Sequence, residues 1–320
     1  MSLDALLTEL DDPDAKIHAA DLTSLSYLAG DARERFLESW RRMSVQRRRE
    51  LIDRLAELTE DNVELDFDAI FLIGLIDDDV QVRAESVKAL WEHEEDELVL
   101  VLLRLLEDPE AIVRAEAALG LGRFLLRAEL DGRDDALTTQ AESALQRVAL
   151  DESELTEVRG RAVESIGARS SEWVRDLIED AYASGDRRLA ISAVHAMGRN
   201  ADPDWLPTII EEMHSEDSEM RFEAAMAAGG IGDEDAVPDL AELASDEDAE
   251  VQEAAIGALG QIGGVPARNV LQSIASESRD ERVLDAVNDA LEEAQFTEDA
   301  MALAPLLADS LGVDDEDEDE

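Results

Sequence analysis

A 31-residue repeat limits the folds open to this chain more than any other sequence feature. Residues 215–270 contain two copies of one pattern, offset by 31 residues. Each copy has an acidic turn, an apolar–polar residue pair, a run of small residues, a Gly-x-x-Gly segment, a proline and a second apolar stretch. The apolar–polar pairs are Met220-Arg221 and Val251-Gln252. A period of this length, with two helices per period, is typical of an α-helical solenoid.

The polar residue of each pair sets a register, with small or apolar residues at +3, +4 and +7 on one helical face. Matches occur at His18, Arg83, Arg114, Arg159, Ala190, Arg221, Gln252 and Leu284. Four of the seven steps are 31 residues and a fifth is 32. The 65-residue first step has room for one more pair, with its register near residue 50. The sequence therefore predicts about nine helix pairs.

One step is 45 residues long and so carries about 14 extra residues. We place them between residues 129 and 141, either as a longer loop between helices or as an extended first helix of the next pair.

The two ends of the chain depart from the repeat. We interpret residues 1–11 as an N-terminal capping helix, 12–293 as the repeat solenoid and 294–313 as a C-terminal capping helix over the open end of the core. Residues 314–320 read DDEDEDE, which cannot bury apolar surface, and we expect a disordered acidic tail. The predicted fold is all-α, a right-handed α-α superhelix in one continuous domain.

The composition is strongly acidic, with 80 Asp and Glu against 28 Lys and Arg and a formal net charge of −52. Only two of the basic residues are lysines, Lys16 and Lys88. This composition resembles that of cytoplasmic proteins from salt-accumulating halophiles, so we expect the chain to unfold on dialysis into low salt. It also argues against nucleic acid as a partner, because that binding begins with phosphate neutralisation.

The chain contains no cysteine, which excludes a disulfide framework, a thiolate metal site and a cysteine nucleophile. No signal segment opens the chain and no apolar run approaches ~18 residues. We therefore expect a soluble, cytoplasmic protein without a membrane anchor.

Five segments carry the repeat most clearly: DDDVQVRAESVKALW, DPEAIVRAEAALGLG, ELTEVRGRAVESIG, SEMRFEAAMAAGGIG and AEVQEAAIGALGQIG. They resemble HEAT repeats of the phycobilisome-lyase-like class. A further segment, ELIDRLAELTEDNVELDFDAIF, resembles the N-terminal part of a group of prokaryotic HEAT proteins. The resemblance implies an armadillo-type solenoid and is weak evidence for function. Our first hypothesis is a non-catalytic interaction scaffold that holds a protein or peptide in its concave groove.

The resemblance also assigns roles within each repeat. In HEAT proteins the register arginine pairs with a carboxylate of a nearby turn, so Arg83, Arg114, Arg159 and Arg221 are expected to be structural. An Asp or Glu before each second helix is expected to cap its free N–H groups. Acidic runs such as 77–79 are interpreted as such turn carboxylates, because they lack the spacing of a calcium loop.

Two enzymatic alternatives follow from the same resemblance. HEAT-type deoxyhypusine hydroxylases hold two irons with several His-Glu pairs, whereas this chain has one pair, His93-Glu94. Bilin lyases are the other precedent, but here we find neither a cysteine nor another element for chromophore attachment. We therefore predict no catalytic residue, no metal and no cofactor, and we interpret His93 as a solvated residue after the helix that contains Trp91.

Positions +1, +5 and +9 of the second helices lie opposite the core stripe and are expected to line the concave face. In two consecutive repeats they carry apolar and basic side chains. The predicted partner-binding groove comprises Ile191, His195, Arg199, Phe222 and Met226. Trp205 either flanks this groove or belongs to the core.

A second candidate surface is an arginine cluster. Eight arginines lie within residues 33–54, including Arg41, Arg42, Arg47, Arg48 and Arg49. These arginines either form a basic docking patch for an acidic partner or phosphate group, or pair internally with nearby acids. If nucleic acid binds this chain, we expect it to bind only through this patch.

Overall fold

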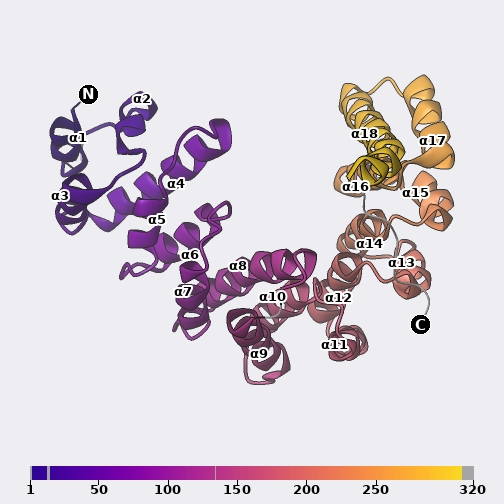
Figure 1. Cartoon of the computed structure of the whole chain (residues 1–320), viewed down its shortest axis with the longest axis horizontal. Coiled ribbons are helices and arrows are strands. Elements are labelled where there is room, and N and C mark those ends of the chain that lie inside the picture. The colour runs from indigo at the N-terminus through magenta and orange to yellow at the C-terminus, as the bar shows by residue number, and fades with distance from the viewer. Residues whose placement is uncertain (1, 13–14, 134, 312–320) are drawn as a thin grey trace. The chain divides into compact units, whose positions relative to one another are not determined.

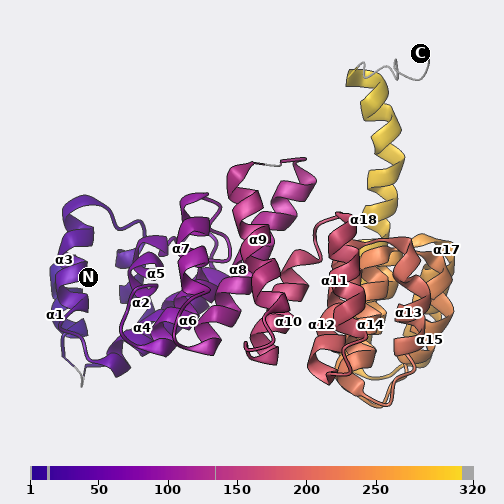
Figure 2. The same cartoon turned by 90° about the horizontal axis from the view of Figure 1, so that it is seen from below.

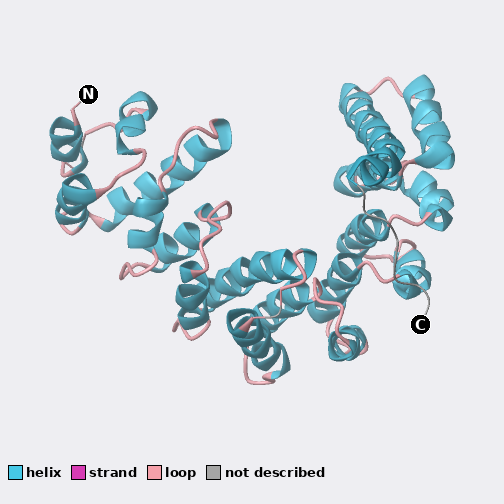
Figure 3. Cartoon of the chain, in the orientation of Figure 1, coloured by secondary structure: helices cyan, strands magenta, loops and turns pink. Residues whose placement is uncertain are grey.

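The computed structural model describes residues 2–12, 15–133 and 135–311, with side chains described as far as residue 296. Every regular element in this part of the chain is a helix (Figure 3). The prediction of an all-α fold is therefore confirmed. The chain forms two compact units, Met1–Ser165 (unit 1) and Ile166–Glu320 (unit 2).

Most consecutive helices from α5 onward pack in pairs, as α5 with α6 and α7 with α8, whereas α1 packs on α3 and α2 on α4. Unit 1 contains α1 (Leu3–Leu10), α2 (Ala19–Leu22), α3 (Gly30–Trp40), α4 (Val45–Asp61), α5 (Asp68–Gly74), α6 (Val80–Ala89), α7 (Glu97–Leu105), α8 (Ala111–Leu130), α9 (Ala136–Leu150) and α10 (Thr156–Ile166), which ends at the unit boundary. A short 3₁₀ turn, Thr23–Leu25, follows α2.

Unit 2 continues the same pattern. It contains α11 (Glu172–Tyr182), α12 (Arg187–Asn200), α13 (Leu206–Glu212), α14 (Ser218–Ile231), α15 (Val237–Leu243), α16 (Ala249–Ile262), α17 (Gly264–Glu277) and α18 (Glu281–Leu311). Within unit 2 the second helices α12, α14, α16 and α18 lie side by side, and the first helices α11, α13, α15 and α17 lie on one side of them (Figure 1).

The predicted register falls on the first turns of the second helices. Arg83 and Arg221 each lie four residues after the N-cap of their helix. The first match, His18, precedes only the four-residue helix α2, so the first repeat is the least regular. The predicted capping by a turn carboxylate fails at α8, where Glu110 makes no capping hydrogen bond, and at α4, which Ser44 caps. It is confirmed at α6, where Asp79 accepts hydrogen bonds from the backbone of Gln81 and Val82. Asp186, Asp217 and Asp248 cap α12, α14 and α16 in the same way.

The extra residues of the 45-residue step lengthen helices. Helix α8 has 20 residues, against 14 in each of α12, α14 and α16. The first helix of the next pair, α9, has 15 residues. The extended-first-helix alternative is therefore right in part, but α8 is lengthened as well, and the longer-loop alternative is wrong. The residues that lengthen α8, 125–130, read LLRAEL and all favour a helix.

Small residues allow the second helices of unit 2 to approach closely. A Cβ atom built on Gly198 of α12 would lie 2.5 Å from the Cα atom of Ala227 on α14. A Cβ atom on Gly230 would lie 2.8 Å from the carbonyl oxygen of Gly198. Only glycine fits at these two positions, so the α12–α14 interface is set by backbone contact.

The chain ends differ in part from the predicted caps. At the N-terminus, α1 packs on α3 through buried Leu6 and Leu10. At the other end, residues 294–311 continue α18 without a break, so the separate helix predicted there is wrong (Figure 2). That α1 caps the core stays a prediction, and the predicted tail, 314–320, lies outside the described residues. None of the helices described has both the length and the apolar character that a membrane span needs.

Candidate partner-binding site

Ile191, the first residue of the predicted groove, does not reach the surface. Its side chain is fully buried in α12. The reason is that α12 packs against both α11 and α14, which leaves only a narrow exposed strip. Position +1 of this helix lies outside that strip, whereas position +5, His195, lies within it. The prediction that Ile191 lines an open groove is therefore wrong.

Trp205 is part of the core of unit 2. Its indole is buried and donates a hydrogen bond of 3.0 Å from Nε1 to Oδ1 of Asn200. Asn200 in turn donates to the carbonyl oxygens of Gly167 and Arg169. The guanidinium of Arg175 lies 4.8 Å from the indole centroid. These contacts show that Trp205 belongs to the core, as one of the two alternatives predicted, and that it does not flank the groove.

The other predicted residues lie on exposed strips of α12 and α14. His195 Nδ1 lies 3.0 Å from Oε2 of Glu223, which joins the two helices. Met226 is 42% exposed, and Phe222, one turn before it, is half-buried. Arg199 is also half-buried on α12. The structure thus places His195 beside the α14 strip that carries Phe222 and Met226.

The next helix leaves space beside Met226. In the register, Gly257 of α16 is the counterpart of Met226, and a Cβ atom on Gly257 would meet no atom within 4 Å. The counterpart of Phe222 on α16 is Glu253, whose side chain is 64% exposed. An exposed thioether therefore borders an open position and an acidic rim. Methionine adapts its shape to a partner surface, so this strip can receive an apolar side chain.

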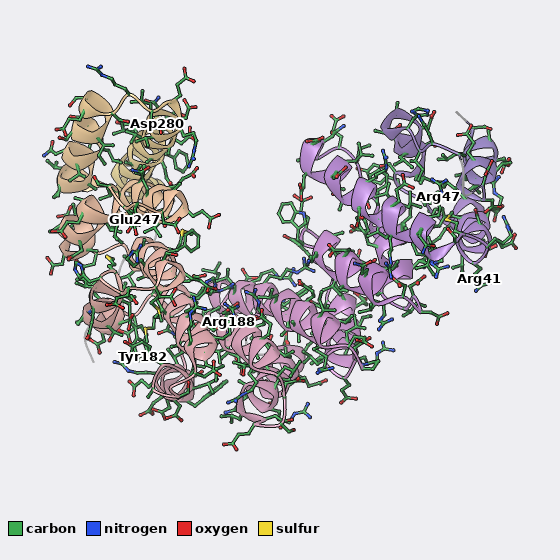
Figure 4. The ribbon with its side chains drawn as sticks, turned by 180° about the vertical axis from the view of Figure 1, so that it is seen from behind. Arg41, Arg47, Tyr182, Arg188, Glu247 and Asp280 are labelled. Atoms are coloured by element: carbon green, nitrogen blue, oxygen red, sulfur yellow. The ribbon has the colours of Figure 1, made fainter. Side chains whose placement is uncertain are left out.

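The basic residues at the start of α12 carry little free charge. Arg187 is hydrogen-bonded to Asp217, and its Nη2 also lies 2.7 Å from Oε2 of Glu219. Arg188, labelled in Figure 4, contacts Glu219 as well. The exposed surface next to Phe222 and Met226 is therefore neutral or acidic.

Most arginines of the cluster in unit 1 form ion pairs or hydrogen bonds with other residues of the same unit. Arg47 is buried and donates to the carbonyl oxygens of Asp12 and Ala15 at 2.7 and 2.6 Å. The cluster also forms the ion pairs Arg35–Asp4, Arg42–Asp11, Arg47–Glu50, Arg48–Asp77, Arg49–Asp79 and Arg54–Glu50. Of the eight arginines, Arg33 and Arg41 are the two that are exposed and form no ion pair within the described residues; Arg41 is labelled in Figure 4. The docking-patch alternative is therefore wrong for Arg42, Arg47, Arg48 and Arg49, because each guanidinium satisfies a carboxylate or carbonyl of its own unit.

Three of the four register arginines form the expected pairs. Arg83 binds Asp108 through two hydrogen bonds of 2.8 and 2.9 Å, and Arg221 binds Asp246 through two of the same lengths. Arg114 binds both carboxylate oxygens of Glu154 at 2.7 Å. We call these three pairs the arginine ladder.

Arg159 departs from this pattern, since its Nε donates instead to the carbonyl oxygen of Ala149 at 3.0 Å. The hydrogen bond from Arg221 is the main cause that holds the pKa of Asp246 below its ordinary value.

The histidines have local roles. His93 is not solvated: its side chain is 10% exposed and Nδ1 lies 2.6 Å from Oδ2 of Asp68, which corrects the prediction for this residue. His214 contacts Asp239 at 2.9 Å. Within the described residues, no three His, Asp or Glu side chains are grouped so that they could hold a metal ion.

Comparisons with known proteins were made for the whole chain. The model of the HEAT-repeat family matches residues 69–146 and 206–292. A comparison with curated protein sequences found no match. Among solved structures, the complex of CpcE and CpcF of phycocyanin lyase from Nostoc sp. PCC7120 is 17% identical and has a TM-score of 0.52, over 87% of this chain and 97% of that chain. This likeness is one of fold.

Two further solved structures are similar at lower TM-scores. Yeast importin-β (Kap95p) is 12% identical with a TM-score of 0.48, over 97% of this chain and 48% of that chain. Human deoxyhypusine hydroxylase in complex with glycerol is 21% identical with a TM-score of 0.30, over 92% of this chain and 96% of that chain.

Proposed function

The chain belongs to the HEAT-repeat family, and from that membership we propose that it is a non-catalytic scaffold that binds a partner protein on the second-helix face of unit 2. Helical repeat proteins commonly present such extended faces to partners. The site comprises Phe222 and Met226 with His195 beside them and the open position at Gly257. A cytoplasmic location and the absence of a cofactor belong to the same proposal.

The observation that carries the proposal is the exposed Met226 next to Gly257. An apolar side chain that is 42% exposed and borders an unfilled position offers a contact that the chain itself does not use. Glu253 adds an exposed carboxylate to the rim, 3.7 Å from Arg282 of α18, and the chain carries a net charge of −52. We therefore infer that the partner segment carries an apolar side chain flanked by lysine or arginine. Apolar packing would supply most of the affinity, and opposite charge would orient the segment.

The alternative is an enzyme of the bilin-lyase or deoxyhypusine-hydroxylase type. Nothing in the described residues favours it, because His93 is bound to Asp68 and His195 to Glu223. The likeness to phycocyanin lyase supports a common fold and does not extend to its reaction.

The proposal is tested with Met226→Asp and a matched control, Leu100→Asp. Both residues are exposed apolar positions of helices, 42% and 46% exposed, so each variant adds one carboxylate at a similar site. The tagged wild type and both variants are used to capture partners from the native cytoplasm in molar KCl, and bound proteins, metals and chromophores are quantified.

We expect a stoichiometric protein partner with the wild type and with Leu100→Asp, and a loss of about 30-fold or more with Met226→Asp. Phe222→Asp should act in the same direction, with helicity by circular dichroism as its folding check. Retention of the partner by Met226→Asp would refute the assigned face. A stoichiometric metal or chromophore without a protein partner would instead favour the enzymatic alternative.

A further inference from the structure

Unit 1 contains a second feature, a pocket between the α6–α7 loop and the last turns of α8. Its volume is about 630 Å³, within the range of small-molecule sites. It is lined by the loop residues Trp91 and His93 and by Arg123, Leu126, Arg127 and Leu130 of α8. All of these residues belong to unit 1, so the pocket is separate from the unit 2 face.

The pocket exists because α8 is longer than other second helices. Residues after Phe124 extend α8 beyond the length of α14, and they include Arg127 and Leu130. Arg127 Nη1 donates to the carbonyl oxygen of Glu94 at 2.7 Å, and Arg123 Nη1 donates to that of Leu90. Because the two arginines are four residues apart on one face of α8, they fix the loop at both of its ends.

The side chains that face the opening are apolar. Trp91 is 57% exposed, Leu130 is 78% exposed and Leu126 is 37% exposed. Phe124 is buried beneath them, with the guanidinium groups of Arg123 and Arg127 at 4.9 and 5.3 Å from its ring centroid. An exposed indole beside two exposed leucines forms an apolar wall that none of the described residues of unit 1 covers.

The two arginines differ in how their charge is balanced. Arg127 forms an ion pair with Asp96 at 2.8 Å. Arg123 has no carboxylate within ion-pair distance among the described residues, and its Nε is buried without a hydrogen-bond partner. The acid with the largest electrostatic effect on the pKa of Arg123 is Asp68, which is already bound to His93. Burial is the main cause that lowers the pKa of Arg123 to about 10.

A half-buried guanidinium without an anion is costly, and a carboxylate would satisfy it through charge-assisted hydrogen bonds. The rim of the pocket is acidic, through Glu92, Glu94 and Asp131. Repulsion from these groups disfavours phosphates and multiply charged ligands. The chemistry that fits is therefore a single negative charge attached to a hydrocarbon group.

We propose that this pocket binds an apolar monocarboxylate, with its carboxylate on Arg123 and its hydrocarbon part against Trp91 and Leu130. Two sources share this chemistry, a free aromatic or aliphatic acid and the C-terminal carboxylate of a peptide that ends in an apolar residue. The site does not depend on the partner face of unit 2.

The experiment is isothermal calorimetry on the full chain with four probes. These are N-acetyl-phenylalanine, its primary amide, a hexapeptide that ends in phenylalanine and the amidated form of that hexapeptide. The variants are Arg123→Gln and Leu130→Glu. The matched controls are Arg104→Gln, an exposed arginine of α7, and Leu155→Glu, a leucine that is 59% exposed outside the pocket.

We expect saturable one-to-one binding of at least one acid, and binding weaker by about tenfold or more for its amide. Arg123→Gln and Leu130→Glu should lower the affinity for the acid by a similar factor, whereas the two control variants should bind the acid as tightly as the wild type does. The tighter of the two acids identifies the source. Since Leu130 is largely exposed, Leu130→Glu keeps the test valid if Arg123→Gln loosens the loop.

The proposal is overturned if the acid and its amide bind equally well, or if no probe gives saturable heat. It is also overturned if Leu130→Glu binds the acid as tightly as Leu155→Glu does.

Discussion

Replacing Arg221 by methionine should destabilise unit 2 by about 3 kcal/mol. Methionine retains most of the aliphatic stem and removes the guanidinium, so packing changes little. The variant deletes two hydrogen bonds to Asp246 and a third, of 2.9 Å, from Nη1 to the carbonyl oxygen of Ser215. The side chains of Arg221 and Asp246 are only 13% and 9% exposed, so water can replace little of what is lost.

The magnitude follows from the state of Asp246 in the variant. Breaking a buried ion pair by removing one partner costs about 3–5 kcal/mol, because a charge remains without compensation. Here Asp246 keeps one hydrogen bond, of 2.8 Å, from the backbone N–H of Asp248. This remaining contact places the expected cost at the lower end, about 3 kcal/mol. Adding Asp246→Asn should recover part of the loss, since it removes the uncompensated charge.

The chain supplies its own control at the next repeat. Gln252 occupies the same register position in α16, but its Nε2 makes one neutral hydrogen bond, of 2.9 Å, to the carbonyl oxygen of Ala244. Gln252→Met should therefore cost only about 1 kcal/mol. The expected difference between the two variants is about 2 kcal/mol, or about 30-fold in the folding equilibrium constant.

Urea unfolding of the full chain, followed by far-ultraviolet circular dichroism at one fixed KCl concentration, measures both values. Urea is preferred to guanidinium because its concentration does not change the ionic strength. Because the two units can unfold separately, all variants are fitted with the same number of transitions. If Arg221→Met costs no more than Gln252→Met, within about 0.5 kcal/mol, the charged pair adds nothing and the reasoning fails.

Three further predictions follow from the same contacts. Gly198→Ala should destabilise the folded chain by about 1–3 kcal/mol, because the new methyl group overpacks on Ala227. Gly257→Ala should stabilise it by up to about 1 kcal/mol, because the methyl group meets no atom within 4 Å. Thermal unfolding of both variants tests this pair of predictions. The folded pKa of Asp246 is depressed, so its pair with Arg221 stabilises fully above the unfolded pKa near 3.8. That stability is lost as the pH falls through the lower folded value, so the difference between wild type and Arg221→Met should shrink in acid; a constant difference in urea titrations would contradict it. With a net charge of −52, the urea midpoint of the wild type should rise between about 0.1 M and 2 M KCl, and a midpoint independent of salt would refute the role of self-repulsion.

Much of the fold was predictable because its determinants are local. The capping role of Asp79 and Asp217 follows from an acidic residue placed before an apolar run, and both side chains cap as expected. The pairing of Arg83 and Arg221 follows from their fixed place in the repeat. The resemblance to HEAT repeats was likewise visible in the sequence and is confirmed by the family match.

The candidate sites were less predictable because exposure depends on neighbouring helices. Position +1 is buried at Ile191 and half-exposed at Phe222, although the register treats them alike. The sequence did not show whether Trp205 flanks the groove or belongs to the core. Its hydrogen bond to Asn200 favours the core. The pocket on α8 was missed entirely. The available signal was Arg123 and Arg127, four residues apart and directly before the insertion predicted between residues 129 and 141.

The arginine ladder also bears on how unit 2 responds to force. Within the described residues of this unit, the pair of Arg221 and Asp246 is the one charged contact at a register position. The neighbouring register positions hold Ala190, which carries no such group, and Gln252 with its single neutral hydrogen bond. On the α12 side, Arg187 pairs with Asp217 and Glu219, so that joint is stiff as well and the compliant one lies at Gln252. Bending therefore concentrates at the Gln252 joint, so the second-helix face changes its curvature there while the joint behind Met226 keeps its shape.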